Sequence, residues 1–354
     1  MNTLLPMIPD QGPLPALSAA EIAELSAEVR ALVAERNATI LAHNYQVPEV
    51  QDVADYVGDS LGLSRQAAAS DAETIVFCGV HFMAETASIL CPEKTVLIPD
   101  LDAGCSLAAS IDAKQLAQWR ASYPEGVVVM YVNTTADVKA LTDYCCTSAN
   151  AVDVVRHIYE TQGPDTEILF GPDMWLGAYV EKELDKRMHV WDGECHVHAG
   201  IRPSDIEATR AAHPGADFLI HPECGCTTSI MEYVAAGDVS AEGVHMLSTG
   251  GMLRYADDLE KLAGDRVDGA ASATASPPRE AVVATETGML YPLEMAAPDV
   301  TFIPANAEAS CVYMKMITLE KLRDALRDMK FEVRVAPEIA ERARIPIDRM
   351  VALG

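Results

Sequence analysis

The chain has 354 residues, of which 49% are hydrophobic and 22% charged, so it has enough apolar material for buried cores and is expected to form two or three domains. Its net charge of −27 argues against nucleic acid or an anionic membrane as a partner. The first twenty residues contain four prolines and no basic segment, which predicts a loose tail rather than a secretory signal. We therefore expect a cytoplasmic protein, whose nine cysteines serve thiol or metal chemistry rather than a disulfide framework.

Residues 21–36 carry apolar side chains at helical spacing, which predicts an amphipathic helix. From there onward the pattern of short apolar strand, loop and helix repeats, as is typical of parallel α/β structure. The expected organisation is an N-terminal tail and helix (1–35), then α/β domains at 36–120, 121–212 and 213–354, the last with C-terminal helices. We refer to these three domains as units one, two and three.

Each unit is predicted to contain four similar segments, and the spacing between equivalent positions supports this repeat. The ends of the first strands are His43, Tyr131 and His221, separated by 88 and 90 residues. Hydroxyl residues follow at Ser60, Ser148 and Ser248, and cysteines at Cys105, Cys195 and Cys311. The surplus in unit three is assigned to residues 235–243 and to a loop insertion at 264–279. The fold class predicted is α/β, with three related parallel-sheet domains in a pseudo-threefold arrangement around a central site.

Polar side chains cluster where the predicted strands end. In parallel α/β sheets ligands bind beyond the carboxyl ends of the strands, so these side chains are candidates for one shared cavity. They are His43, Tyr45 and Ser60 in unit one, Tyr131, Asn133 and Ser148 in unit two, and His221, Glu223, Ser248 and Thr249 in unit three. Because the chain is so acidic, an anionic ligand would have to be held by helix N-termini, hydroxyls and backbone N–H groups.

Structural roles are an alternative for several of these residues. Serines are common helix N-caps, Ser60 included, and the two tyrosines could be strand-end packing residues. Met83, Met174 and Met289 are expected in the core, and His196 at the surface. The six cysteines outside the repeat are interpreted as buried thiols: Cys78, Cys91, Cys145, Cys146, Cys224 and Cys226.

Cys195 lies in the segment Gly193-Glu194-Cys195-His196-Val197-His198, where the glycine is expected to allow a sharp turn and His198 to face the same point as the thiol. One cysteine per unit suits either zinc or a [4Fe-4S] cluster with one open iron. A zinc site that adds His198 would indicate a hydrolase or lyase, and a non-enzymatic iron-sulfur sensor is a further alternative.

Eight motifs resemble the quinolinate synthase family of NAD biosynthesis, in that family's order. They are His43-Asn44-Tyr45, Gly58-Asp59-Ser60, Ala103-Gly104-Cys105-Ser106, Tyr131-Val132-Asn133, Gly193 to His198, His221-Pro222-Glu223-Cys224, Ala284 to Met289 and Cys311 to Met316. The resemblance implies three α/β domains and the condensation of iminosuccinate, supplied by an aspartate oxidase, with dihydroxyacetone phosphate. Phosphate and water are then lost and quinolinate is formed. The enzyme is expected to be a monomer or a homodimer.

By matching position, the resemblance implies that Cys105, Cys195 and Cys311 ligate a [4Fe-4S] cluster. The substrate-binding residues it implies are His43, Ser60, Tyr131, Asn133, Ser148, His221, Glu223 and Thr249. We assign proton transfer at the triose to Tyr45 and His198, and the ring-closing steps to Glu223 and His221. Some relatives carry a Cys-x-x-Cys-x-x-Cys run at the third ligand, whereas here Cys311 stands alone, which argues against thiol-disulfide control there.

Overall fold

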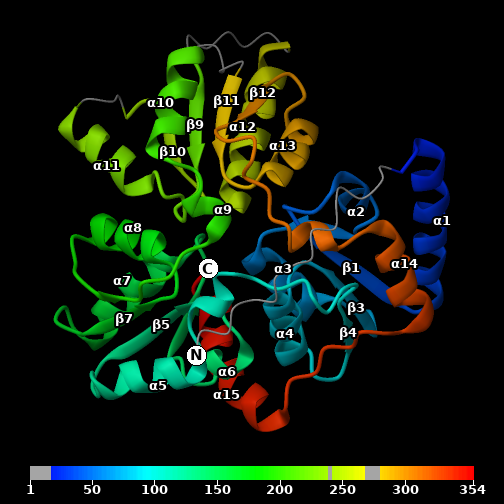
Figure 1. Cartoon of the computed structure of the whole chain (residues 1–354), viewed down its shortest axis with the longest axis horizontal. Coiled ribbons are helices and arrows are strands. Elements are labelled where there is room, and N and C mark those ends of the chain that lie inside the picture. The colour runs from blue at the N-terminus through cyan, green and yellow to red at the C-terminus, as the bar shows by residue number, and fades with distance from the viewer. Residues whose placement is uncertain (1–16, 238–240, 268–279) are drawn as a thin grey trace.

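Three parallel four-stranded sheets form the frame of the structure, a computed structural model that describes residues 17–237, 241–267 and 280–354 (Figure 1). Their strand orders are β2-β1-β3-β4, β6-β5-β7-β8 and β10-β9-β11-β12. Each sheet thus places its first strand second and its second strand at the edge. The predicted α/β class with three related parallel-sheet units is confirmed, while the exact domain boundaries stay predictions.

The first sheet lies on the right of Figure 1 and contains the first four strands. They are β1 (Ala38–His43), β2 (Tyr56–Gly58), β3 (Thr74–Cys78) and β4 (Thr95–Leu97). The helices of this region are α1 (Ala19–Glu35), α2 (Pro48–Asp52), α3 (Ser60–Ala69) and α4 (His81–Leu90). All residues of β3 are buried, because helices cover both faces of a parallel sheet and its inner strands are continuous apolar runs.

The second sheet repeats this arrangement at the lower left of Figure 1. Its strands are β5 (Val127–Tyr131), β6 (Tyr144–Cys146), β7 (Ile168–Gly171) and β8 (His189–Val190). Its helical segments are η1 (Ala108–Ser110), α5 (Ala113–Ala121), α6 (Ala136–Lys139), α7 (Ala151–Gln162), α8 (Met174–Leu184) and α9 (His196–Ala199). The short α9 begins directly after Cys195 and points the chain towards the third sheet (Figure 1).

The third sheet occupies the top of Figure 1. Its strands are β9 (Asp217–Ile220), β10 (Val244–Met246), β11 (Glu280–Ala284) and β12 (Thr301–Pro304). Its helical segments are α10 (Pro203–Ala212), α11 (Thr227–Ala236), α12 (Thr249–Val267), η2 (Thr287–Met289), α13 (Leu290–Ala296) and η3 (Met314–Met316). Helix α12 extends to Val267, so residues 264–267, which were predicted to belong to a loop insertion, are helical; the rest of that predicted loop, residues 268–279, lies outside the described ranges.

The last two helices leave the third sheet and pack on the other two. Helix α14 (Leu319–Asp328) packs against α1, and α15 (Pro337–Ala352) packs against α6 and β6 (Figure 1). A short bridge pairs Glu332 with Leu97 of β4, which places the connecting segment along the first sheet. The C-terminal segment therefore helps to hold the three sheets together.

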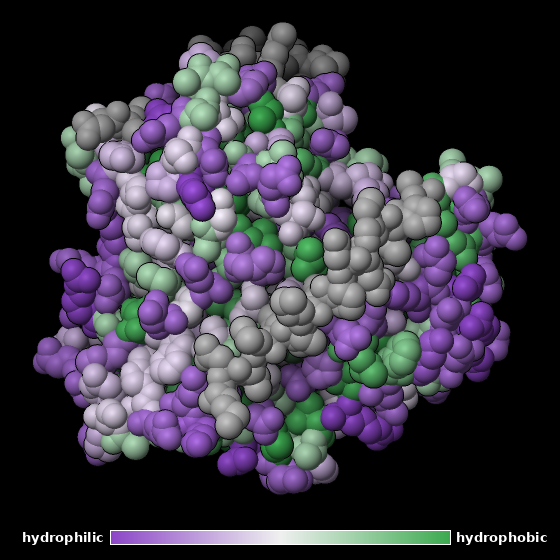
Figure 2. All heavy atoms as spheres, viewed as in Figure 1, coloured by the Kyte–Doolittle hydropathy of each residue, from purple (hydrophilic) through white to green (hydrophobic). Residues whose placement is uncertain are grey.

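The N-terminal helix starts earlier than expected. Ser18 caps it by accepting the backbone N–H of Glu21, whose side chain in turn accepts the N–H of Ser18. Ala19 and Ala20, which were expected in the tail, are therefore helical, and residues 1–16 lie outside the described part. Hydrophilic side chains predominate over the outer helices at the right edge of Figure 2. Among the described helices, none has the length and apolar character needed to span a bilayer.

Candidate active site

One pocket between the three sheets is lined by all but one of the residues that the sequence assigned to the site; the exception is Ser248, which does not line it. The thirteen residues are His43, Tyr45, Ser60, Cys105, Tyr131, Asn133, Ser148, Cys195, His198, His221, Glu223, Thr249 and Cys311. They come from segments up to 268 positions apart, and all three sheets contribute. The predicted central site is thereby present as a cavity.

The first strand of each sheet contributes equivalent residues to this pocket. His43 is the last residue of β1, Tyr131 is the last residue of β5, and His221 follows β9 directly. Two residues further along each chain segment lie Tyr45, Asn133 and Glu223, which also line the pocket. Carboxyl ends of parallel strands are the usual ligand-binding edge, and here three such edges meet.

Helix N-termini supply hydroxyl groups at the same pocket. Ser60 is the first residue of α3, and Thr249 is the first residue of α12. The prediction that Ser60 caps α3 is wrong, because Asp59 is the N-cap and its Oδ1 accepts the N–H of Gly62 at 2.8 Å. The Ser60 side chain is therefore not needed as a cap. Ser248 does act as a cap, since its hydroxyl accepts the N–H of Gly251 at 3.2 Å.

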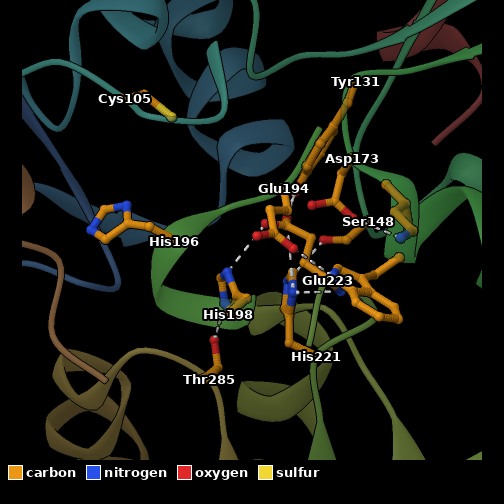
Figure 3. A network of polar contacts seen from close by, with 12 residues as sticks. Cys105, Tyr131, Ser148, Asp173, Glu194, His196, His198, His221, Glu223 and Thr285 are labelled. Atoms are coloured by element: carbon orange, nitrogen blue, oxygen red, sulfur yellow. Dashed lines mark hydrogen bonds and ion pairs between the residues drawn. The ribbon is translucent and has the colours of Figure 1, made fainter. Parts of the chain in front are cut away.

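A buried charged pair lies at the centre of the polar network (Figure 3). His198 Nδ1 lies 3.2 Å from Glu223 Oε2, and both side chains are at most 4% exposed. The Tyr131 hydroxyl donates a hydrogen bond to Glu223 Oε1. Burial disfavours both charges, but the interactions of His198 with Cys195 and with the Glu223 carboxylate raise its pKa to about 10. The neighbouring imidazoles of His198 and His221 outweigh burial and lower the pKa of Glu223 to about 2.

On its other side, His198 contacts two hydroxyls. Its Nε2 lies 2.8 Å from Thr285 Oγ1 and 3.2 Å from the Tyr45 hydroxyl, which is itself 2.6 Å from Thr285. Burial and the charge of Glu223 hold the pKa of Tyr45 well above its usual value. Tyr45 therefore stays protonated, beside a protonated imidazole.

His43 and His221 are neutral and share one tautomer. Burial lowers the pKa of each ring to about 3. Nδ1 of His43 accepts the N–H of Tyr45 at 3.2 Å, and Nδ1 of His221 accepts the N–H of Glu223 at 3.3 Å. The proton of each neutral ring is therefore on Nε2, which in His221 lies 3.1 Å from the Ser148 hydroxyl. Two equivalent strand ends thus present an N–H donor as a result of the same local geometry.

The three pocket cysteines are free thiols and are partly exposed, whereas four others are free and buried. Burial raises the pKa of the Cys105 thiol to about 12 and raises those of Cys195 and Cys311. Figure 3 shows Cys105 on the opposite side of the cavity from His198 and Glu223. Three cysteines, one from each unit, thus line one pocket.

One prediction about the cysteine segments needs correction. Cys224 and Cys226 form a disulfide and are not free thiols; the repeat gave no reason to expect this pairing. Gly193 does lie in a tight turn, where its N–H donates to the carbonyl oxygen of Trp191 at 3.0 Å, and it has no left-handed backbone conformation. It is needed for close packing, because a Cβ there would lie 2.5 Å from the carbonyl oxygen of Pro172. His196 is exposed as expected, but it also lines the pocket, with Nδ1 2.6 Å from the Ser106 hydroxyl.

Three buried residues of this site had no role predicted from the sequence. Thr285 and Glu286 directly follow β11, and Asp173 follows β7 at the corresponding edge of the second sheet. Burial and the charge of Glu223 hold the pKa of Asp173 well above its usual value, and its carboxyl group lies beside the network (Figure 3). The rule that strand ends carry ligand-binding residues would have found all three, had it been applied to the third strand of each unit.

Comparison with known proteins identifies the family. The family described as Quinolinate synthetase A protein matches residues 27–352. A quinolinate synthase of Thermus thermophilus is 53% identical over 330 residues, which cover 93% of this chain and 97% of that protein. The quinolinate synthase of Mycobacterium tuberculosis strain H37Rv is 53% identical over 330 residues, 93% of this chain and 88% of that protein. That of Mycolicibacterium paratuberculosis is 54% identical over 333 residues, 94% and 89% of the two chains. The chain belongs to the quinolinate synthase family of enzymes.

Proposed function

We propose that this enzyme condenses iminosuccinate with dihydroxyacetone phosphate to give quinolinate, with loss of phosphate and water, in NAD biosynthesis. The observation that carries the proposal is the convergence of three free thiols, one per unit, on a pocket that also contains a buried His198–Glu223 pair. An aspartate oxidase would supply the unstable imine. We propose a cytoplasmic monomer or homodimer as the working form.

The donor set fits a [4Fe-4S] cluster held by Cys105, Cys195 and Cys311. All three thiols are free, line one pocket and are more accessible than the buried cysteines elsewhere. Three thiolates leave one iron of such a cluster without a protein ligand. When the cluster is bound, this iron would supply Lewis acidity that favours loss of a substrate hydroxyl group.

The anionic groups of both substrates would be held by the strand ends and helix N-termini. The residues proposed for substrate binding are His43, Ser60, Tyr131, Asn133, Ser148, His221, Glu223 and Thr249, of which the ionised Glu223 would accept hydrogen bonds rather than hold an anion. His43 and His221 present Nε2–H donors, and Ser60 and Thr249 lie at the N-termini of helices, where backbone N–H groups attract anions. The chain as a whole has a net charge of −27 and therefore repels anions. These neutral hydrogen-bond donors would make the electrostatic environment of the pocket favourable to an anion.

Tyr45 and His198 are proposed to donate a proton to the triose. The Tyr45 hydroxyl is 3.2 Å from Nε2 of the protonated His198 ring, so a proton given up by Tyr45 can be replaced from the imidazole. Glu223 is ionised and accepts hydrogen bonds from Tyr131 and His198. These hydrogen bonds stabilise the negative charge that remains on the carboxylate once the proton has been transferred. Glu223 and His221 are proposed to move protons in the ring-closing steps.

Anaerobic purification, followed by iron and sulfide analysis and a visible spectrum, tests the proposal. We expect about four iron and four sulfide per chain, a broad absorption that bleaches in air, and formation of quinolinate from the two substrates. A colourless protein that keeps stoichiometric zinc and takes up no iron on cluster reconstitution would instead favour a zinc hydrolase or lyase, whereas zinc that is bound only while the cluster is absent would not. A protein that stays metal-free after cluster reconstitution would overturn the cluster assignment.

A further inference from the structure

We propose that Cys195, His198 and Glu223 form a second metal site, which binds one divalent transition-metal ion such as Zn²⁺ when the chain carries no cluster. One ligand atom from each of these residues lies within 4.8 Å of the other two. The proposal rests on the proposed function in one respect only: Cys195 is also a proposed cluster ligand. The two metal groups would therefore exclude each other.

The distances are close to those that a tetrahedral ion requires. His198 Nδ1 and Glu223 Oε2 are 3.2 Å apart. For zinc bonded to nitrogen and oxygen at about 2.1 Å, a tetrahedral angle separates the two ligand atoms by about 3.4 Å. A thiolate, an imidazole and a carboxylate are also a ligand set typical of zinc, and a water molecule would complete the four positions. A small movement of the Cys195 side chain would bring its sulfur atom within bonding distance of the same ion.

The neighbours of these residues orient them as the outer contacts of a metal site do. His198 Nε2 is engaged by Thr285 at 2.8 Å, which leaves Nδ1 directed at Glu223. Tyr131 donates to Glu223 Oε1, which leaves Oε2 available. Metal-ligating histidines and carboxylates are usually fixed by such hydrogen bonds on their second atom. The site is thus largely arranged before the ion arrives, and the ion would displace the Nδ1 proton of His198 and the thiol proton of Cys195 into solvent.

The consequence is competition during cluster assembly. Cys105 and Cys311 are not part of this group of ligand atoms, so an ion at Cys195, His198 and Glu223 would occupy one of the three cluster thiols and leave the other two free. Zinc bound there would slow the incorporation of a cluster. The ligand proposed for this site is a soft or borderline divalent cation, and its binding requires no protein or substrate partner.

Metal titration of the full-length chain, with its cluster removed under anaerobic conditions, tests this site. The probes are Zn²⁺, measured by competition with a chromophoric chelator, and Co²⁺, measured by its thiolate charge-transfer band. The Cys105→Ser variant is informative because it lacks a cluster ligand yet keeps the proposed zinc ligands. We expect it to bind one Zn²⁺ per chain as tightly as the parent chain does.

Replacing the proposed ligands should have the opposite effect. Cys195→Ser should abolish the cobalt charge-transfer band, and His198→Gln and Glu223→Gln should each weaken zinc binding by more than about 100-fold. Thr285→Val should weaken it about 10- to 100-fold, as expected for an outer contact of a ligand. His196→Ala is the matched control, since His196 lines the same pocket two residues from His198 but is outside the group, and it should bind as the parent does.

The outcomes separate this proposal from the enzymatic one. Loss of zinc binding in Cys105→Ser as well as in Cys195→Ser would place the ion among the three cysteines and overturn the proposal. Failure of the parent chain and of Cys105→Ser to bind zinc would overturn it too. Circular dichroism of each variant shows whether it is folded. Because Cys105→Ser cannot hold the proposed cluster, its zinc binding is independent of whether the parent forms a cluster or quinolinate.

Discussion

Glu286 Oε1 lies 2.9 Å from the backbone nitrogen of Cys311, so a fully buried carboxylate holds the main chain of a proposed cluster ligand. The same carboxylate pairs with Lys315, with Oε1 3.0 Å from Nζ, and Lys315 also donates to the carbonyl oxygen of Tyr45. Gly288 makes this approach possible, because a Cβ there would lie 2.7 Å from both Glu286 and Lys315. The contacts connect a cysteine of unit three to the proposed proton donor of unit one.

Glu286→Ala is expected to destabilise the cluster. It removes the acceptor of the Cys311 N–H and leaves Lys315 without its carboxylate, so iron should be lost to a chelator about 10- to 100-fold faster than from the parent. Glu286→Gln keeps an acceptor oxygen and should show an intermediate rate. The control is Glu308→Ala, three residues before Cys311. The Glu308 side chain is exposed, so this substitution should leave the rate of iron loss unchanged. Equal rates for Glu286→Ala and Glu308→Ala would remove Glu286 from this role.

Tyr45→Phe should lower turnover about 10²- to 10⁴-fold while leaving the iron content unchanged, because it removes a proton donor and no metal ligand. Quinolinate formation and iron content, measured on the same preparation, check this. Thr285→Val serves as a comparison, since it removes the 2.6 Å contact to the hydroxyl but leaves the Tyr45 proton in place, and its effect should be smaller. If turnover and iron fell together in Tyr45→Phe, the tyrosine would be structural.

Serine in place of Cys105, Cys195 or Cys311 should abolish the visible absorbance of the cluster in each case. The matched control is Cys91→Ser, because Cys91 is a buried thiol that donates to the carbonyl oxygen of Ala67, and serine can replace it in that bond. Any of the three variants that kept full absorbance would show that its cysteine is not a ligand.

Acid should destabilise the cluster-free chain partly through His43. Burial lowers the pKa of this ring to about 3, whereas in the unfolded chain it protonates near about 6.5. Between these values the unfolded state binds more protons, so the stability is present above about pH 6.5 and is lost as the pH falls towards 3. One such group contributes about 1 kcal/mol between about pH 7.5 and 5.5.

Urea unfolding of the parent chain and of His43→Gln at these two pH values measures the contribution of His43. The free energy of unfolding should fall by about 1 kcal/mol less in the variant than in the parent. Identical losses would mean that the His43 ring has the same pKa in the folded and in the unfolded chain, contrary to its buried, N–H-accepting position.

The sequence was sufficient to predict the three units and the lining of the pocket. Short, fully apolar strands repeated at nearly constant spacing, and the residues at their carboxyl ends were polar in every unit. That pattern has few structural solutions, since parallel strands need helical connections and collect ligand-binding residues at one edge. His43, Tyr131 and His221 do lie at equivalent positions.

Other features depend on contacts that no local pattern encodes. Asp59 and Ser60 are both good N-caps, and only the backbone geometry decides between them. The role of Glu286 depends on the approach of Cys311, 25 residues away, and of Lys315. Helices α14 and α15 are amphipathic in sequence, but their sequence does not say that they pack on the first and second sheets rather than on the third.

The three sheets share one strand order, but the side chains they present at equivalent positions differ. At the strand ends, unit one offers histidine and tyrosine, unit two tyrosine and asparagine, and unit three histidine and glutamate. A ligand turned by one third of a revolution would meet a similar backbone but the wrong donors, and in one orientation the Glu223 carboxylate would repel its anionic groups. Because the repeats differ at these positions, we expect three sheets of one strand order to bind their ligand in a single orientation.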